Sequence, residues 1–276
     1  MVHTEPAPIR LLGEADVSAA LELSREANWN QTASDWMLFI RNGSVSGLEH
    51  DGVLAATAAI MPYGDDRGWI GMVLTRKAHR GKGFGTAMLK HCLAALEAQG
   101  RAVLLDATPA GEPLYRALGF KGMWSSTRWR GQVARTAQGR PAAVSSEGRR
   151  QAVARDGAAF GVERDILLSD FAARVPEVFQ VVNDAVCFGR NGDRATQIGP
   201  LACRDEAAGL KLLETALQKI DGTVILDIPD SAEATVAYIE EKGFARERPF
   251  LRMIKGQCAN PDSDWRHIAI AGPEFG

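Results

Sequence analysis

The feature that most constrains this chain is a glycine-rich loop, Arg80–Thr86, between a strand-like run and a helical pattern. The run before it, Trp69–Thr75, is short and mostly apolar, which is typical of a strand. Glycine lets a backbone bend tightly and approach a ligand closely, and larger residues alternate here with Gly81, Gly83 and Gly85. The helix that follows starts with unpaired N–H groups and a partial positive charge. Because Arg80 and Lys82 add formal charge, the unit predicts a diphosphate site.

The rest of the first half predicts a mixed domain of strands and helices around this loop. Apolar residues in helical periodicity favour helices, and short apolar or alternating runs favour strands. Asp51-Gly52 is the strongest short signal for a hairpin turn. The expected order is strand Ile9–Leu12, helices Asp16–Ala27 and Thr32–Gly43, strands Ser44–His50, Val53–Met61 and Trp69–Thr75, a helix to Gln99, strand Ala102–Ala107, helix Glu112–Leu118 and strand Phe120–Trp129.

Two motifs in this order are specific. Arg80-Gly-Lys-Gly-Phe-Gly85 fits the pattern (Q/R)-x-x-G-x-(G/A), and Tyr115-Arg-Ala-Leu-Gly-Phe120 follows further along the chain. The N-terminal part, residues 1–131, therefore resembles a GCN5-related N-acetyltransferase (GNAT) domain. The resemblance implies acetyl-CoA as co-substrate, held through strand and loop backbone groups. The implied cofactor-binding residues are Val73, Leu74, Thr75, Arg80, Gly81, Lys82, Gly83, Phe84, Gly85 and Thr86.

The second half repeats the first in outline. Helices are expected near 149–158, 163–173 and 205–220, with strands near 177–183, 185–190 and 194–201. Three pairs of segments correspond in the same order, which argues for an internal repeat. These pairs are Trp69–Gly71 with Gln197–Gly199, Val103–Pro109 with Val224–Pro229, and Tyr115–Phe120 with Tyr238–Phe244.

The whole chain thus resembles the two-domain, YitH-type bacterial acetyltransferases. The residues that carry this resemblance are Phe160–Arg164, Gln197–Leu201, Leu226–Pro229, Gly243-Phe244, Arg252-Met253 and Ala269–Gly276. The implied fold class is α/β (α+β), with tandem GNAT-like domains that each have a mixed, mainly antiparallel twisted sheet flanked by helices. The expected division is a GNAT domain at 1–131, a linker at 132–148 and a diverged GNAT-like domain at 149–276.

The second repeat lacks the diphosphate loop. The chain after Ile198 has no R-G-x-G-x-G pattern, and Asp205 and Glu206 stand where a helix is expected to begin. Their charges would repel a diphosphate at that helix start. The sequence therefore predicts one CoA for each chain, bound by the first domain.

The segment between the repeats is rich in Gly, Ala, Arg and Ser, which is typical of a linker. Its neighbourhood holds several arginines that are open to two interpretations, a basic patch or a solvated linker. The solvated linker is favoured because runs of charge are usually exposed to water. The arginines concerned are Arg128, Arg130, Arg135 and Arg140.

The chemistry of acyl transfer needs an unprotonated amine, donors for a tetrahedral oxyanion and a proton for the departing thiolate. The resemblance implies that Tyr115 is the acid, and a phenol with a pKa near ~10 is protonated at neutral pH. A core aromatic at the end of a helix is the alternative for this residue.

The general base stays open. Asp106 follows an apolar strand, where it could face the site or cap a turn, and an ordered water could replace any side chain. His79 precedes the loop and is expected to be exposed.

The acceptor site is predicted less directly. Asn28 and Trp29 lie between the first two helices, a region that lines the acceptor site in GNAT proteins, although Trp29 and Trp36 are more often core residues. Glu274 is a candidate to bind a cationic amine, against the alternative of a frayed terminus. The remaining candidate for the acceptor site is Asp106.

Composition excludes several classes of protein. A net charge of −2 gives no reason to expect nucleic acid or an anionic membrane as partner. No apolar run is long enough for a membrane span, and the N-terminus lacks a signal-peptide pattern. The four cysteines form no C-x-x-C pair, which disfavours a zinc site or a disulfide framework, and no metal is expected. A cytoplasmic monomer or homodimer is the resulting expectation; the cysteines are Cys92, Cys187, Cys203 and Cys258.

Two functions from different classes remain. The favoured one is an acyltransferase that moves acetyl from acetyl-CoA directly to a small amine through a tetrahedral intermediate, with the acceptor cleft between the two domains. The other is a CoA-binding regulatory or interaction module without turnover. A protein acceptor is disfavoured because nothing suggests an acidic groove for a lysine-rich peptide.

Overall fold

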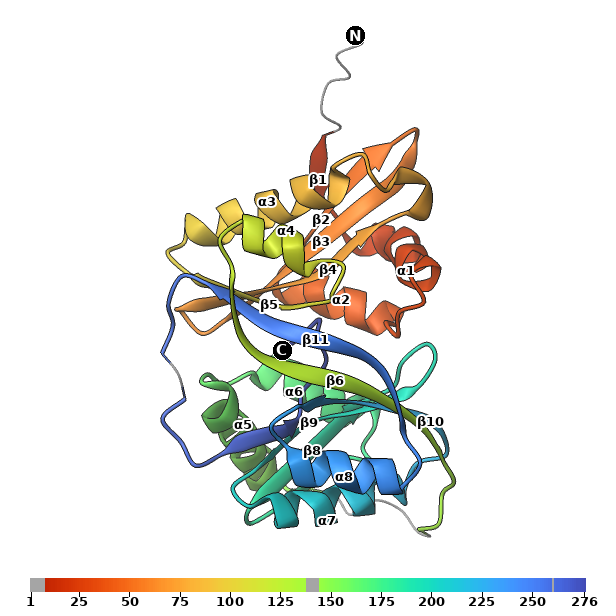
Figure 1. Ribbon diagram of the computed structural model, residues 1–276, viewed down its shortest axis with the longest axis vertical. Helices are drawn as coiled ribbons and strands as arrows, with labels where there is room; N and C mark the ends of the chain where they lie inside the picture. Colours follow the sequence, from red (N-terminus) through yellow and green to blue (C-terminus); the bar gives the residue numbers. More distant parts are fainter. Residues whose placement is uncertain (1–7, 138–143, 260) are drawn as a thin grey trace. The chain divides into compact units, whose positions relative to one another are not determined.

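The computed structural model describes residues 8–137, 144–259 and 261–276. The chain divides into two compact units, residues 1–105 and 106–276 (Figure 1). No helix in the described ranges combines the length and the apolar character needed to cross a lipid bilayer.

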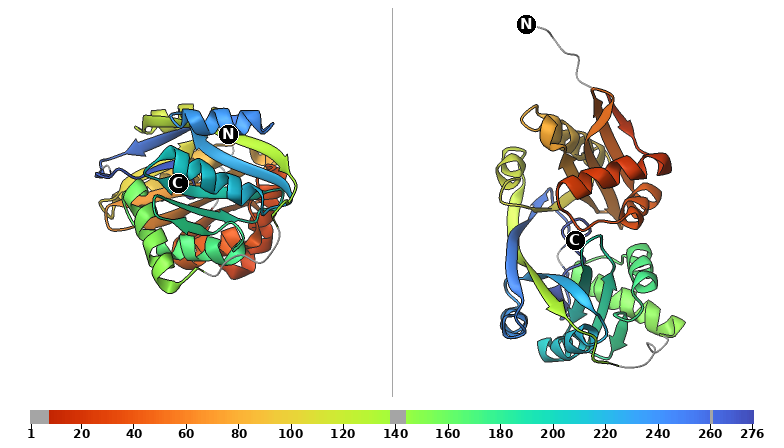
Figure 2. Two further views of the ribbon diagram at one scale, coloured as in Figure 1. Left: turned by 90° about the horizontal axis from the view of Figure 1, so that it is seen from below. Right: turned by 90° about the vertical axis from the view of Figure 1, so that its right-hand side faces the viewer.

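The first unit is built on a sheet whose strands lie in the order of the sequence. Neighbouring strands are antiparallel, except that β4 and β5 are parallel. Helices α1 and α2 cover one face of this sheet and α3 covers the other (Figure 2). The elements are β1 (Ile9–Leu11), η1 (Glu14–Asp16), α1 (Val17–Glu26), α2 (Ala33–Asn42), β2 (Ser44–His50), β3 (Val53–Tyr63), β4 (Arg67–Thr75), η2 (Lys77–His79), α3 (Phe84–Glu97) and β5 (Ala102–Ala107).

Local signals explain why the first unit follows the predicted order. Asp51 and Gly52 have φ angles of 54° and 75°, as a two-residue type I′ hairpin requires, so β2 and β3 begin and end about where the sequence predicts. Thr32 caps α2: the Asp35 carboxylate accepts a 2.7 Å bond from the Thr32 N–H. Met88, Leu89, Cys92, Leu93 and Leu96 are buried on one face of α3, as their spacing predicts.

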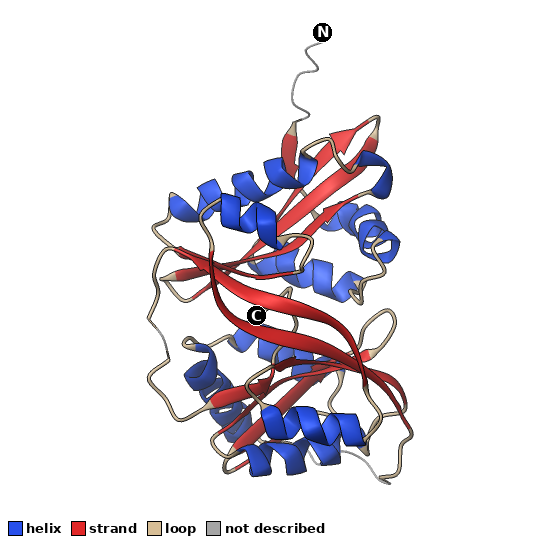
Figure 3. Ribbon diagram, in the orientation of Figure 1, coloured by secondary structure: helices blue, strands red, loops and turns tan. Residues whose placement is uncertain are grey.

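The strands of the second unit lie in the order β11-β6-β10-β9-β8-β7, with β12 paired to β9. Figure 3 shows β6 and β11 as long neighbouring strands. The elements are α4 (Glu112–Ala117), β6 (Lys121–Val133), α5 (Ser146–Phe160), α6 (Asp165–Arg174), β7 (Gln180–Val182), β8 (Ala185–Arg190), β9 (Thr196–Cys203), α7 (Glu206–Leu217), β10 (Gly222–Pro229), α8 (Glu233–Glu241), β11 (Ala245–Lys255) and β12 (Arg266–Ala269).

The core of the second unit lies between its sheet and helices α7 and α8. The residues that the repeat aligned with the first domain are inside it, including Ile198, Val224 and Phe244. A parallel β9–β10 pair and the α7 crossover reproduce the β4–α3–β5 arrangement of the first unit. The internal repeat predicted from the sequence is thus present as repeated secondary structure.

Strand β6 departs from what the sequence suggested. It is the last strand of the first repeat along the chain, yet it lies between β10 and β11 and pairs with both. β6 continues to Val133 and α5 begins at Ser146, so the expected linker at 132–148 includes ordered ends. Its middle, 138–143, lies outside the described residues. The domain division at 131 and 149 therefore stays a proposal.

The prediction of solvated arginines is wrong for Arg128. This side chain is 3% exposed and gives two hydrogen bonds, of 2.8 and 2.7 Å, to the fully buried carboxylate of Asp227. Arg130 pairs with Glu247 at 2.7 Å and is partly exposed, while Arg135 is exposed as expected. Arg140 lies outside the described residues. The linear run of charge misled the interpretation because the partner strand lies far along the chain.

A chain of buried polar contacts continues from this pair. Gln197 donates a 2.7 Å bond to Asp227 and accepts a 2.8 Å bond from Arg190. Arg190 also forms an ion pair with Glu274, which is 4% exposed. The expectation of a frayed terminus is therefore wrong: Glu274 is part of the interior of the second unit, next to the fully buried Phe275.

Candidate active site

The glycine loop leads into an open helix start. Gly81 and Gly83 have φ angles of 77° and 82°, and Gly83 is the N-cap of α3. No side chain of the described residues caps this helix. A Cβ placed on either glycine would meet no other atom within 4 Å, so the loop faces open space. The first N–H groups of α3 are thus presented to a ligand, as anion binding requires.

Charged side chains border this helix start. Arg80 and Lys82 are exposed, and Lys82 Nζ lies 3.4 Å from His79 Nδ1. His79 is only 8% exposed, so the expectation of an exposed histidine is wrong. Burial follows from ring contacts, because the rings of His50 and Phe84 lie 5.3 and 6.2 Å from the His79 ring.

The strand before the loop separates from its parallel neighbour. The β4–β5 ladder covers Arg67–Trp69 paired with Ala102–Leu104, and β4 then continues to Thr75. The other edge of this extension stays paired with β3, through Thr57↔Leu74 and Ala56↔Thr75. One edge of the backbone around Val73 is therefore not paired with β5, and its contacts with pantetheine stay a prediction.

A β-bulge in β4 was not predicted from the sequence. Met72 has a φ of 51°, which is unusual for a residue other than glycine, and the β3–β4 register shifts beside it. Thr57 Oγ1 donates a 2.9 Å bond to the Met72 carbonyl, and both residues are buried. The strained turn re-aims the backbone of Val73 and Leu74. The sequence does not predict this bulge, because Met72 is not one of the residue types that commonly adopt a positive φ.

The strand end and the helix start come together. A Cβ placed on Gly85 would lie 3.3 Å from Thr75 Oγ1, so this glycine permits a close approach. The end of β4 and the first turn of α3 therefore lie next to each other in the first unit. Thr86 and Phe84 lie in the first turn of α3 and are partly buried.

The equivalent helix start in the second unit is closed. Asp205 caps α7 by accepting 3.3 Å bonds from the N–H groups of Ala207 and Ala208. The Glu206 carboxylate accepts bonds of 2.9 and 2.8 Å from the N–H and hydroxyl of Thr235. The N–H groups that would hold a diphosphate are thus bonded to the protein, beside two negative charges.

Tyr115 lies in α4, within the second unit, and is partly buried. Burial raises the pKa of its phenol to about 12, so the phenol is protonated at neutral pH. Its ring lies 6.0 Å from the ring of Phe120, edge to face. A Cβ on Gly111 would be 2.9 Å from the tyrosine ring, so the glycine at the N-cap makes room for it.

Asp106 is held by an ion pair. Its buried carboxylate accepts bonds of 2.8 and 2.9 Å from Arg252. Burial raises the pKa of Asp106, and the Arg252 guanidinium acts in the opposite direction. Both carboxylate oxygens thus accept a bond from Arg252, and a role for Asp106 as base or in the acceptor site stays a prediction.

The predicted acceptor residues of the first unit follow α1. Asn28 is exposed with a φ of 58°, and Trp29 is partly buried. Trp36 is fully buried and donates a 3.1 Å bond to Ser24, which fits the core interpretation. Asn28 and Trp29 are therefore accessible, and their contact with an acceptor stays a prediction.

Family comparisons match both halves of the chain. A sequence model described as "Acetyltransferase (GNAT) family" matches residues 15–120, and one described as "Acetyltransferase (GNAT) domain" matches residues 152–268. The chain is a tandem GNAT protein. Acetyl-CoA is the co-substrate of GNAT acetyltransferases, and acyl-CoA-dependent acetyl transfer is the general activity that follows. Comparison with curated proteins found no match.

Solved structures share the fold of this tandem GNAT protein. A putative acetyltransferase from Pyrococcus horikoshii has a TM-score of 0.81 at 17% identity, over 100% of this chain and 98% of that one. A GCN5-related N-acetyltransferase from Sphaerobacter thermophilus has a TM-score of 0.64 at 14% identity, over 91% and 96% of the two chains. A putative acetyltransferase from Thermoplasma acidophilum has a TM-score of 0.57 at 10% identity, over 91% and 100%.

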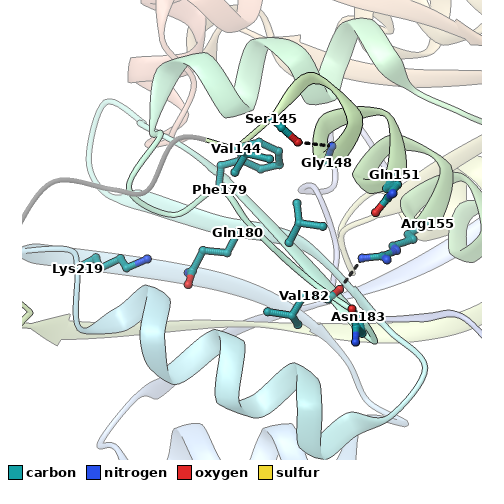
Figure 4. Close-up of a pocket in the computed structure, with 11 residues that line it drawn as sticks. Val144, Ser145, Gly148, Gln151, Arg155, Phe179, Gln180, Val182, Asn183 and Lys219 are labelled. Carbon is teal, nitrogen blue, oxygen red and sulfur yellow. Dashed lines mark hydrogen bonds between the residues drawn. The ribbon is translucent and has the colours of Figure 1, made fainter.

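The second unit also carries a polar pocket of about 440 Å³ (Figure 4). It lies at the start of α5, beside the β7–β8 turn, and Gly148 N–H donates a 3.0 Å bond to Ser145 there. Arg155 in its wall donates to the Val182 carbonyl. None of the site residues predicted from the sequence lines this pocket.

Proposed function

We propose that this GNAT protein transfers the acetyl group of one acetyl-CoA, bound at the β4–α3 loop, to a small amine. The observation that carries the proposal is the contrast between two equivalent helix starts. The α3 start is open behind Gly81 and Gly83, and the α7 start is closed by Asp205 and Glu206. The first unit is therefore the acetyl-CoA site, and the second unit serves another role.

In the proposed mechanism, a neutral amine attacks the thioester carbonyl and a tetrahedral oxyanion forms. Backbone N–H groups beyond the Met72 bulge stabilise this oxyanion, because the β4–β5 ladder ends at Trp69 and leaves that edge of β4 for a ligand. The C–S bond then breaks, and the thiolate accepts a hydrogen bond from Tyr115. A phenol with a pKa of about 12 remains protonated, so Tyr115 stabilises the thiolate as a donor, and the proton released by the amine balances the reaction.

A CoA-binding module without turnover is the second candidate, because the open glycine loop is sufficient for binding and does not require catalysis. The two candidates differ in thiol release. An enzyme releases free CoA thiol only when a suitable amine is present, whereas a module binds acetyl-CoA and releases none. The small amine as acceptor, the acceptor cleft between the domains, the cytoplasmic location and the oligomeric state all remain predictions.

Replacing Gly83 with alanine should weaken acetyl-CoA binding by about 5- to 30-fold. Alanine at positive φ costs about 1–2 kcal/mol, so the loop leaves the conformation that aims its N–H groups, and binding must restore it. Isothermal titration calorimetry measures this, with one acetyl-CoA expected for each wild-type chain.

Gly243→Ala is the matched control, because Gly243 has a φ of 80° and an equally open Cβ position in the second unit. It should carry the same backbone strain and leave acetyl-CoA affinity unchanged. Equal loss of affinity in both variants, or two acetyl-CoA per wild-type chain, would contradict a single site at the loop.

The pH dependence follows from the tyrosine. A donor must be protonated, so the contribution of Tyr115 is present below its pKa of about 12 and lost only above it. Turnover should rise with pH as the acceptor amine loses its proton, with no descending limb up to about pH 10. A pH profile of kcat checks this; a fall with a midpoint between pH ~8 and ~9 would show that the essential acid is another group.

A further inference from the structure

Two histidines and an aspartate converge beside the glycine loop, and acetyl transfer has no use for them. His50 ends β2, Asp51 is the first turn residue, and His79 ends η2. One ligand atom from each residue lies within 4.8 Å of the ligand atoms of the other two. His50 Nε2 and Asp51 Oδ2 are 3.6 Å apart. All three residues belong to the first unit, so the cluster depends on one compact body.

The backbone holds these residues in place before any ligand arrives. The type I′ turn fixes Asp51 and Gly52 at positive φ. His79 is the last residue of a short helix that begins after Arg76, and Arg76 donates bonds to the Leu54 carbonyl at 2.8 Å and to Glu22 at 2.9 Å.

The two imidazole rings are also set close together by packing. They meet edge to face at 5.3 Å, and the His50 ring lies 5.1 Å from the ring of Phe84. A site that is already assembled loses little entropy when it binds.

We propose that His50, Asp51 and His79 bind a divalent transition metal of the Zn²⁺ class. Two ligands each about 2.0–2.1 Å from zinc in tetrahedral geometry are roughly 3.4 Å apart, close to the His50–Asp51 spacing of 3.6 Å. Two imidazoles and one carboxylate suit zinc, and Mg²⁺ or Ca²⁺ would demand oxygen ligands. Three protein ligands leave a fourth position for water.

Lys82 connects this metal site to the loop. Its ammonium lies 3.4 Å from His79 Nδ1, and an ammonium can donate only to an unprotonated ring nitrogen. A bound cation would repel Lys82 and compete with it for His79. Lys82 is exposed, so its ammonium can turn from His79 toward the loop at little cost, and the metal adds positive charge nearby. This coupling rests on the proposed acetyl-CoA site; the metal site itself does not.

Zinc titration of the full chain by calorimetry tests the site. The wild type should bind one zinc at the cluster, and His50→Gln and Asp51→Asn should each weaken binding at least about tenfold, since even the loss of an outer-shell partner costs that much. Asp51→Asn should keep the fold, because Asn-Gly is as good a type I′ turn as Asp-Gly. His91→Gln is the control, since His91 is exposed on α3 outside the cluster, and it should bind zinc like the wild type.

The coupling has its own readout. Zinc at saturation should lower the acetyl-CoA dissociation constant by about fivefold or more in the wild type and leave it unchanged in Asp51→Asn. No zinc isotherm in the wild type, or equal zinc affinity in the wild type and both cluster variants, would overturn the metal site. Zinc binding that the cluster variants lose, in a chain that binds no acetyl-CoA, would support the metal site and contradict the proposed function instead.

Discussion

Tyr115→Phe should lower kcat about 100-fold and leave the acetyl-CoA dissociation constant unchanged. The substitution keeps the ring and its packing against Phe120 but removes the one proton donor of the side chain. A positioned acid contributes at least about 100-fold to the rate, because the thiolate otherwise departs without a donor. Steady-state kinetics by thiol release, together with calorimetry for binding, separate the two effects.

The second repeat supplies the control. Tyr238 lies in α8 of the unit whose helix start is closed, one residue before Ile239, which is the residue that corresponds to Tyr115 by its backbone bond to the phenylalanine after the helix. Tyr238→Phe should keep full turnover. If Tyr115→Phe also kept full turnover at every pH, or if both variants lost it equally, Tyr115 would not be the donor.

Asp227→Asn should destabilise the second unit by about 3–5 kcal/mol. The asparagine keeps the size of the side chain but leaves Arg128 as a buried charge without its anion, which is the costly way to break a buried pair. Gln197, which donates a 2.7 Å bond to Asp227, would have to share the one remaining acceptor oxygen with Arg128, so the effect extends along β9. Urea unfolding gives the free-energy change.

Native-state hydrogen exchange would show where that loss falls. Amides of β9 and β10 should exchange faster, and those of β2 and β3 should be unaffected. Glu247→Gln is the matched control, because it breaks the neighbouring pair with the partly exposed Arg130, and exposed pairs contribute at most about 1 kcal/mol. Equal destabilisation by the two variants would contradict the assigned difference in burial.

Local signals were enough to predict most of the elements. β2 and β5 have the predicted bounds. The Asp51-Gly52 turn determines where β2 ends, and the apolar run Ala102–Ala107 determines the extent of β5. The loop and the open α3 start were equally predictable, since glycine, a helix start and two cations act within a few residues. Those are interactions that depend on neighbours in the sequence.

What could not be predicted depends on partners far along the chain. The sequence placed Arg128 in a solvated run of charge, because its partner Asp227 belongs to a strand in the other repeat. The sequence favoured a frayed terminus at Glu274, because its partner Arg190 lies far away in the sequence, on β8. The Met72 bulge depends on the register between β3 and β4, and no single residue predicts that register. His79 was misplaced because its burial comes from the His50 and Phe84 rings.

The most direct test of the central claim is CoA thiol release from acetyl-CoA, followed with a panel of small primary amines. The wild type should release thiol only when an acceptor amine is added, in equal amount to the acetylated amine found by mass spectrometry. Gly83→Ala should reach the same rate only at higher acetyl-CoA, and Gly243→Ala should match the wild type. Acetyl-CoA binding at the loop with no acceptor-dependent thiol release from any amine would contradict the enzyme and favour a CoA-binding module.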